Sequence, residues 1–185
     1  MIGNDIIDLR FTAGHSKWQH PRFMDKLFRK QEQELINCST QPFTAIWELW
    51  AKKEAAYKAY IQKHPSRFFN PKAFECTDTE VRYKDFKIKV QTAISPSMIY
   101  AETVSNKKVI RNIMRVSAHP REQSECLRRT LLNEVSTTFK TELELLKIVF
   151  DQAGIPKLYK EDSILDVELS FTHHGSFAAY LLAYS

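Results

Sequence analysis

A glutamate, Glu54, stands where a predicted helix should present an apolar face. The segment WELWAKKEAAYK ends at Lys58, and at about 100° of rotation per residue Glu54 lies on the side of Trp47 and Trp50. An ionised carboxylate among aromatic rings is unfavourable unless it meets a cation or a metal ion. The position of Glu54 therefore predicts a charged partner. The opposite side of this helix, predicted to face solvent, carries Glu48, Lys52, Ala59 and Gln62.

A second carboxylate, Asp5, lies in the opening segment MIGNDIIDL, which is largely apolar and predicts a short strand. Aspartate is depleted in strands, so its presence in this predicted strand indicates a specific role. Strand alternation places Asp5 on one face with Gly3 and Ile7, and Asp8 on the other face. Because glycine has no side chain, Gly3 would let another segment approach the backbone closely beside Asp5.

Asp5 and Glu54 have the chemistry of Mg²⁺ ligands. This ion takes one or two protein carboxylates and fills its other positions with water and substrate phosphate oxygens. Lys58, one helical turn after Glu54, could hold a phosphate beside such an ion, as could Lys53. The alternative is a structural ion pair between Glu54 and Lys58 at i,i+4 spacing. The pattern alone leaves both interpretations open.

Other candidate residues carry weaker signals. His173 follows a predicted strand and could project from a turn into a cleft, although turn histidines are commonly incidental and this one lacks zinc-ligand spacing. Basic residues form a stripe on the outward face of a predicted helix, which suits either solvent or an acidic partner. The stripe comprises Arg22, Lys26, Arg29 and Lys30.

The expected elements are helices and antiparallel strands in a single α+β domain covering residues 1–185, with the sheet packed against helices. Helices are predicted at 21–37, 44–62 and 120–152. Strands are predicted at 81–90, with a turn at Lys84-Asp85, and at 98–104 and 109–117, as an antiparallel meander. Two further strands are predicted at 164–172 and 177–184, joined by a turn at 173–176.

Composition narrows the class of protein. At 185 residues and 43% hydrophobic content the chain can bury a core without disulfides. Its net charge of +5 favours an acidic partner, whether nucleic acid, phosphorylated small molecule or protein. The three cysteines have no metal-type spacing, which predicts a reduced, cytoplasmic protein. The N-terminus has neither a basic leader nor a long apolar run, so neither secretion nor membrane insertion is expected.

Together these segments resemble the 4′-phosphopantetheinyl transferase superfamily. Its Gly-x-Asp motif stands here as Gly3-Asn-Asp5, and its Trp/Phe-x-x-Lys-Glu-Ala/Ser-x-x-x-Lys motif as WAKKEAAYK, which ends at Lys58. Segments 22–32, 154–156 and 169–173 are also similar to the family. The order of these motifs resembles the single-domain holo-acyl-carrier-protein synthase type.

The resemblance implies a reaction and a set of partners. Coenzyme A would donate its 4′-phosphopantetheine to a serine of an acidic acyl or peptidyl carrier protein, releasing adenosine 3′,5′-bisphosphate. Nucleic acid and membrane would play no part. The small type forms its sites between protomers of a trimer, which leaves open whether His173 serves its own chain or a neighbour's Asp5 and Glu54. The alternative is a basic nonenzymatic module that binds RNA or an acidic protein.

The resemblance also implies residue roles. Asp5 and Glu54 would hold Mg²⁺, and Glu54 would also accept the serine proton, directly or through water. Coenzyme A would contact Lys53, Lys58, His173 and Arg67, and the basic stripe would receive the carrier. The chain departs from the family in three places: Ile7 replaces a third acid of the two-lobed type, Arg29 replaces a Ser/Thr, and HPSRFF replaces a glycine-rich turn.

Overall fold

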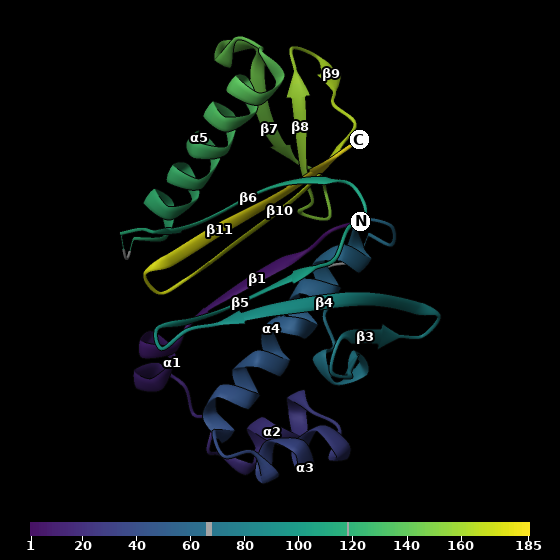
Figure 1. Cartoon of the computed structure of the whole chain (residues 1–185), viewed down its shortest axis with the longest axis vertical. Coiled ribbons are helices and arrows are strands. Elements are labelled where there is room, and N and C mark those ends of the chain that lie inside the picture. Colours follow the sequence, from purple (N-terminus) through teal and green to yellow (C-terminus); the bar gives the residue numbers. More distant parts are fainter. Residues whose placement is uncertain (66–67, 118) are drawn as a thin grey trace.

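Strand β1 (Asn4–Asp8) runs through the middle of the molecule, and the two halves of the chain pack on either side of it (Figure 1). The computed structural model describes residues 1–65, 68–117 and 119–185. Antiparallel sheets pack against helices, which confirms the predicted α+β class. Each half has its own buried apolar cluster.

The first half packs helix α4 (Pro42–Ile61) against a five-stranded sheet of order β1-β5-β4-β3-β2. The remaining strands of this sheet are β2 (Glu75–Cys76), β3 (Glu80–Tyr83), β4 (Phe86–Ile94) and β5 (Met98–Thr103). Smaller helices fill the end of this half: α1 (Leu9–His15), α2 (Pro21–Leu27), α3 (Lys30–Cys38) and the 3-10 helix η1 (Pro71–Ala73).

The second half repeats this plan. It begins with β6 (Lys108–Arg115) and α5 (Pro120–Phe139), which has 20 residues like α4. As β1 pairs with the last strand of its half, so β6 pairs with the last strand here, β11 (Phe177–Tyr184). The order is β10-β11-β6, with β10 spanning Val167–His174. A second sheet completes the half: η2 (Leu143–Leu145) leads into β7 (Leu146–Phe150), β8 (Pro156–Lys160) and β9 (Ser163–Ile164).

Side chains of β10 join the two halves along a seam with β1. The backbone N–H groups of Asn4, Ile6 and Asp8 donate, in that order, to acceptor atoms on Ser170, Thr172 and His174 at 3.1, 3.2 and 3.0 Å. The other edge of β1 pairs with β5. The seam thus satisfies buried amides that would otherwise lack a partner.

Gly3 explains how α4 comes so close to β1. A Cβ atom at this position would lie 2.0 Å from the carbonyl oxygen of Ala55 and 2.7 Å from the backbone nitrogen of Ala59. Both atoms are helix backbone, which cannot turn aside as a side chain can. The absence of a side chain at Gly3 therefore lets α4 lie directly on the strand that carries Asp5.

Several predicted boundaries are wrong. The helix predicted at 21–37 is two helices, because the chain is extended at Phe28, whose side chain is fully buried. The helix predicted to reach residue 152 ends at Phe139, since Lys140 adopts a left-handed conformation with φ of 49°. Strand β6 pairs with β11 and not with β5, so it does not extend the meander. His173 and His174 belong to β10, and only Gly175 and Ser176 form the turn.

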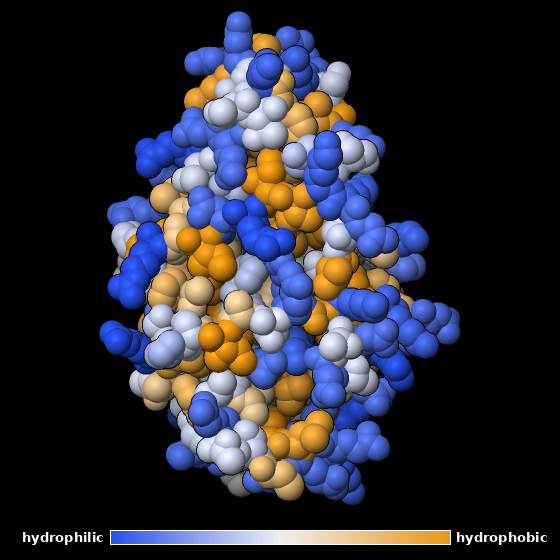
Figure 2. All heavy atoms as spheres, in the orientation of Figure 1, coloured by the Kyte–Doolittle hydropathy of each residue, from blue (hydrophilic) through white to orange (hydrophobic). Residues whose placement is uncertain are grey.

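The surface is mixed in character. Figure 2 shows hydrophilic side chains around the outline of one face, with separate hydrophobic patches along its middle. Within the residues that the structure describes, we find no helix with the length and apolar character needed to cross a membrane.

Candidate active site

Asp5 is held in place by hydrogen-bond donors from two other elements. Its Oδ1 atom receives Lys58 Nζ from α4 at 3.0 Å and the Thr172 hydroxyl from β10 at 2.9 Å. Asp5 is only 7% exposed. In the described part of the chain no hydrogen bond reaches its second oxygen, Oδ2. One carboxylate oxygen is thus fixed by the protein, and the other is left for a ligand.

Glu54 lies half-buried on α4 beside this carboxylate. The pKa of Glu54 is raised from 4.5 to about 7. Burial contributes most to this rise and the charge of Asp5 adds to it, whereas the charge of Lys58 partly opposes it. Among the described residues no hydrogen bond or ion pair reaches its carboxylate. Two neighbouring carboxylates of like charge are a donor set that a divalent cation neutralises. Lys58 pairs with Asp5, and among the described residues it forms no ion pair with Glu54, so the charged partner of Glu54 stays a prediction.

The raised pKa of Glu54 predicts a pH-dependent stability of the metal-free protein. A carboxyl whose folded-state pKa is raised favours folding when protonated, so this stability is fully present below pH 4.5 and is lost as the pH rises to about 7. Glu54→Gln should therefore be more stable than wild type at pH 8 by on the order of 1–3 kcal/mol, with a much smaller difference at pH 5.

Urea unfolding in a chelator at both pH values measures this effect. Glu34→Gln is the matched control, because Glu34 is exposed on α3. Stability curves of wild type and Glu54→Gln that keep the same separation at pH 5 and pH 8 would contradict the prediction.

Lys58 and His173 complete the group. Lys58 Nζ also donates to the carbonyl oxygen of Asn4 at 2.9 Å, so the amine is anchored on β1. Partial burial lowers the pKa of His173, and the charge of Lys58 lowers it further. His173 therefore lies near Lys58 within the same chain.

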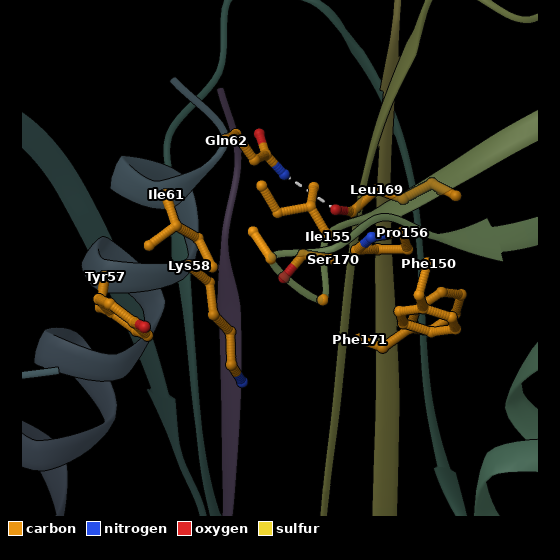
Figure 3. A pocket seen from close by; sticks show the side chains of 12 residues that line it. Tyr57, Lys58, Ile61, Gln62, Phe150, Ile155, Pro156, Leu169, Ser170 and Phe171 are labelled. Atoms are coloured by element: carbon orange, nitrogen blue, oxygen red, sulfur yellow. Dashed lines mark hydrogen bonds between the residues drawn. The ribbon is translucent and has the colours of Figure 1, made fainter. Parts of the chain in front are cut away.

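A cavity of about 360 Å³ opens beside these residues, between the two halves (Figure 3). Tyr57, Lys58 and Ile61 of α4 line one side. The other side is formed by Phe171 of β10, by Phe150 at the end of β7, and by Ile155 and Pro156 where β8 begins. Figure 3 shows the Lys58 amine projecting along this space. The cavity thus combines apolar walls with a cation at the carboxylate pair.

Gln62 bridges the halves at the rim of the cavity, although it was predicted to face solvent. Its side chain accepts from Ile2 N at 3.0 Å and donates to Leu169 O at 2.9 Å, the bond drawn in Figure 3. In the sequence, the i,i+4 spacing between Lys58 and Gln62 was the signal that both side chains lie on one face of the helix. Lys52 and Ala59, also predicted to face solvent, are buried, because α4 is covered by the sheet on that side.

Lys53 does not belong to the site. Its side chain is fully buried and its ammonium donates to Glu32 at 2.8 Å and to the carbonyl oxygens of Pro71 and Phe74. All three N–H groups of the amine are thereby used in holding α4 to α3 and η1. The prediction that Lys53 contacts coenzyme A is therefore wrong. Arg67, the other predicted contact, lies outside the described residues.

Both carboxylate oxygens of Asp8 accept backbone hydrogen bonds at the seam. Its side chain caps α1 by accepting from Arg10 N and Phe11 N, and its other oxygen accepts from Ser176 N at 2.9 Å. Burial raises the pKa of Asp8, but these backbone donors and His174 outweigh burial and lower it overall. With both oxygens already bonded, Asp8 joins β1 to the β10–β11 turn.

The basic stripe is only partly available to a partner. Arg22 and Lys26 on α2 and Lys30 on α3 are exposed. Arg29 instead pairs with Glu75 at 2.9 Å and donates to the carbonyl oxygens of Lys72 and Ala73. Arg29 thus joins the start of α3 to η1 and β2, and its predicted role in docking stays a prediction.

In the described residues no cluster of three or more histidine, cysteine or acidic side chains could hold a metal ion. Asp5 and Glu54 are two carboxylates, the number that Mg²⁺ takes from a protein when water and substrate oxygens fill its other positions.

Comparison with known proteins decides the family. The profile of the 4′-phosphopantetheinyl transferase superfamily matches residues 1–107, which is more than half of the 185 residues. The chain belongs to this superfamily. It is also 28% identical over 134 residues to a holo-[acyl-carrier-protein] synthase of Chlamydia caviae, an alignment that covers 71% of this chain and 96% of that relative.

The protein is therefore a transferase enzyme, and the alternative of a nonenzymatic basic module is set aside. The matched region contains Asp5, Glu54 and Lys58. His173 and the far wall of the cavity come from the second half, beyond residue 107. The complete candidate site of this transferase thus depends on both halves.

Proposed function

We propose that this transferase moves the 4′-phosphopantetheine group of coenzyme A to a serine of an apo acyl or peptidyl carrier protein and releases adenosine 3′,5′-bisphosphate. The observation that carries the proposal is the pair of carboxylates, Asp5 and Glu54, beside the Lys58 amine at the cavity between the halves. The name of the Chlamydia relative supports a carrier protein as acceptor.

The substrate pyrophosphate would lie at the Lys58 end of the cavity. Lys58 pairs there with a phosphate oxygen, which offsets charge on the leaving group. His173, neutral because burial and Lys58 lower its pKa, donates a hydrogen bond to the nucleotide portion. The apolar walls around Ile155, Pro156 and Phe171 then accept a less polar part of the donor.

In the transfer step the serine oxygen forms a bond to the phosphorus that carries the pantetheine. The bond from that phosphorus to the bridging oxygen breaks, and the bridging oxygen leaves with adenosine 3′,5′-bisphosphate. Glu54 accepts the serine proton, directly or through water, as the general base of the step. Asp5 and Glu54 would hold Mg²⁺, which neutralises charge on the pyrophosphate when bound.

Incubation with coenzyme A, Mg²⁺ and apo carrier proteins tests the proposal by mass spectrometry. A gain of one phosphopantetheine on the carrier is the expected result. Omission of Mg²⁺ should remove the gain, and addition of chelator should do the same. No gain across several acyl and peptidyl carriers, with folded enzyme and an active control transferase, would sink the proposal.

A single chain should suffice for this reaction. Asp5, Glu54, Lys58 and His173 come together from one copy, so we propose that a trimer is not required. Activity that stays proportional to enzyme concentration through dilution supports this, together with the mass in solution. We further propose the cytoplasm as its location, where coenzyme A is present.

The exposed part of the basic stripe should dock the acidic carrier. Arg22→Glu with Lys26→Glu should raise KM for the carrier about tenfold at low salt, because opposite charges across an interface attract. The KM for coenzyme A should stay unchanged, and the effect should shrink as salt is added.

A matched control changes the same charge elsewhere. Lys147→Glu with Lys160→Glu alters two exposed lysines on neighbouring strands of the second half. Equal changes in carrier KM for the two double variants would show that net charge, and not the stripe, governs docking.

A further inference from the structure

We infer that Thr172 is a positioning residue for the cation site, because its hydroxyl fixes the rotation of the Asp5 carboxylate and leaves one oxygen free for a divalent ion. The inference rests on the proposed function in taking that ion as the cofactor of the transfer. It assigns a role to a residue of the second half, on the strand that faces β1 across the seam.

The contacts of the Thr172 hydroxyl determine where its proton points. Thr172 is only 5% exposed. Its Oγ1 accepts from Ile6 N at 3.2 Å and stands 2.9 Å from Asp5 Oδ1. Because an amide N–H can only donate, the acceptor side of the hydroxyl faces β1, and its single proton points to Asp5.

Both donors to Asp5 reach the same oxygen. Lys58 Nζ and the Thr172 hydroxyl meet at Oδ1 at 3.0 and 2.9 Å. They approach from α4 and β10, which lie on different sides of β1, so together they resist rotation of the carboxylate. No described residue donates to Oδ2. A hydrogen bond that holds a metal ligand in this way orients the ligand and raises metal affinity.

Thr172 matters most once substrate is bound. Lys58 is 25% exposed at its side chain and carries a positive charge, so a substrate phosphate competes with Asp5 for its amine. Thr172 is neutral and buried, and it keeps its bond to Asp5 when Lys58 turns to the phosphate. The hydroxyl thus holds the carboxylate during the stage at which the cation is needed.

Binding of Mn²⁺, measured by the electron paramagnetic resonance signal of the free ion, tests this role without reference to activity. Thr172→Val keeps the shape of the side chain and removes its hydroxyl, so it should weaken Mn²⁺ binding about tenfold. Thr172→Ser restores the hydroxyl and should bind within about threefold of wild type.

Ser170→Ala is the matched control. It removes the neighbouring seam bond, to Asn4 N at 3.1 Å, without contacting Asp5. It should bind Mn²⁺ within about twofold of wild type. If Thr172→Val does not fold, Thr172→Cys, which has a weaker donor of similar shape, should show a loss in the same direction.

Each outcome bears on the inference. Folded Thr172→Val that binds Mn²⁺ as wild type does would overturn the positioning role alone. Equal losses for Ser170→Ala and Thr172→Val would assign the effect to the seam in general and overturn it as well. A wild-type protein that binds no Mn²⁺ would overturn both the inference and the proposed cation site, whereas Mn²⁺ binding without transfer would contradict only the proposed reaction.

Discussion

Glu54→Gln should lower kcat/KM for phosphopantetheine transfer about 10³-fold while the protein stays folded. Glutamine has nearly the shape of glutamate, but its amide neither accepts the serine proton nor contributes a negative charge to a cation. The carboxylate is half-buried and beside Asp5, so water does not replace either contribution. Transfer rates with coenzyme A and an apo carrier, measured against circular dichroism and urea unfolding of the same samples, check both parts.

Glu48→Gln separates this effect from a general change to α4. Glu48 lies on the same helix, pairs with Lys52 at 2.8 Å and accepts from the Thr92 hydroxyl at 3.0 Å, away from the site. Its substitution should leave transfer within about threefold of wild type, because its partners Lys52 and Thr92 do not contact Asp5 or Lys58. If Glu54→Gln keeps more than a tenth of wild-type activity, Glu54 is neither the base nor an essential ligand.

Gly3→Ala should destabilise the protein by at least about 3 kcal/mol, at the upper end of overpacking effects. The added methyl group would meet the carbonyl oxygen of Ala55 at 2.0 Å, and only a shift of the whole helix relieves that contact. Such a shift would carry Glu54 and Lys58 away from Asp5, so activity should fall in whatever protein still folds. Urea unfolding and the transfer assay measure the two effects.

Gly14→Ala supplies the control for this substitution. Gly14 lies in α1, and nothing comes within 4 Å of a Cβ placed there. Alanine also favours helix over glycine by up to about 1 kcal/mol, so this variant should be as stable as wild type or slightly more so. Wild-type stability of Gly3→Ala would mean that α4 does not lie on β1 as described.

Local pattern predicted the elements that carry the site. Alternation in residues 1–9 and helical spacing through Lys58 reflect short-range geometry, so β1 and α4 were close to their observed bounds. The same patterns predicted wrong helix ends where one residue adopts a backbone conformation that stops the helix. The leucine repeat continues past Lys140 in the sequence, but the left-handed turn there sends the chain into η2 and β7.

Local sequence patterns did not predict which strands pair with each other. Strands β5 and β6 are neighbours in sequence and read as one meander, yet β6 pairs with β11 some seventy residues later. Pairing depends on which surfaces bury one another, and alternation within a strand does not encode its partner. Thr172 and Gln62 escaped notice for the same reason, since their bonds reach Asp5 and Leu169 across the seam.

The sequence by itself determined which residues have the required chemistry: Asp5 after Gly3, and Glu54 with Lys58 on one helix. Only the tertiary structure decided which lysine serves the site. Lys53 is next to Glu54 in sequence, but its buried amine forms an ion pair with Glu32 of α3, whereas the amine of Lys58 pairs with Asp5. The rotation of the helix between residues 53 and 58 makes the two lysine side chains leave α4 in different directions. The elements packed around α4 then determine that one side chain is buried in the core and the other lines the cavity.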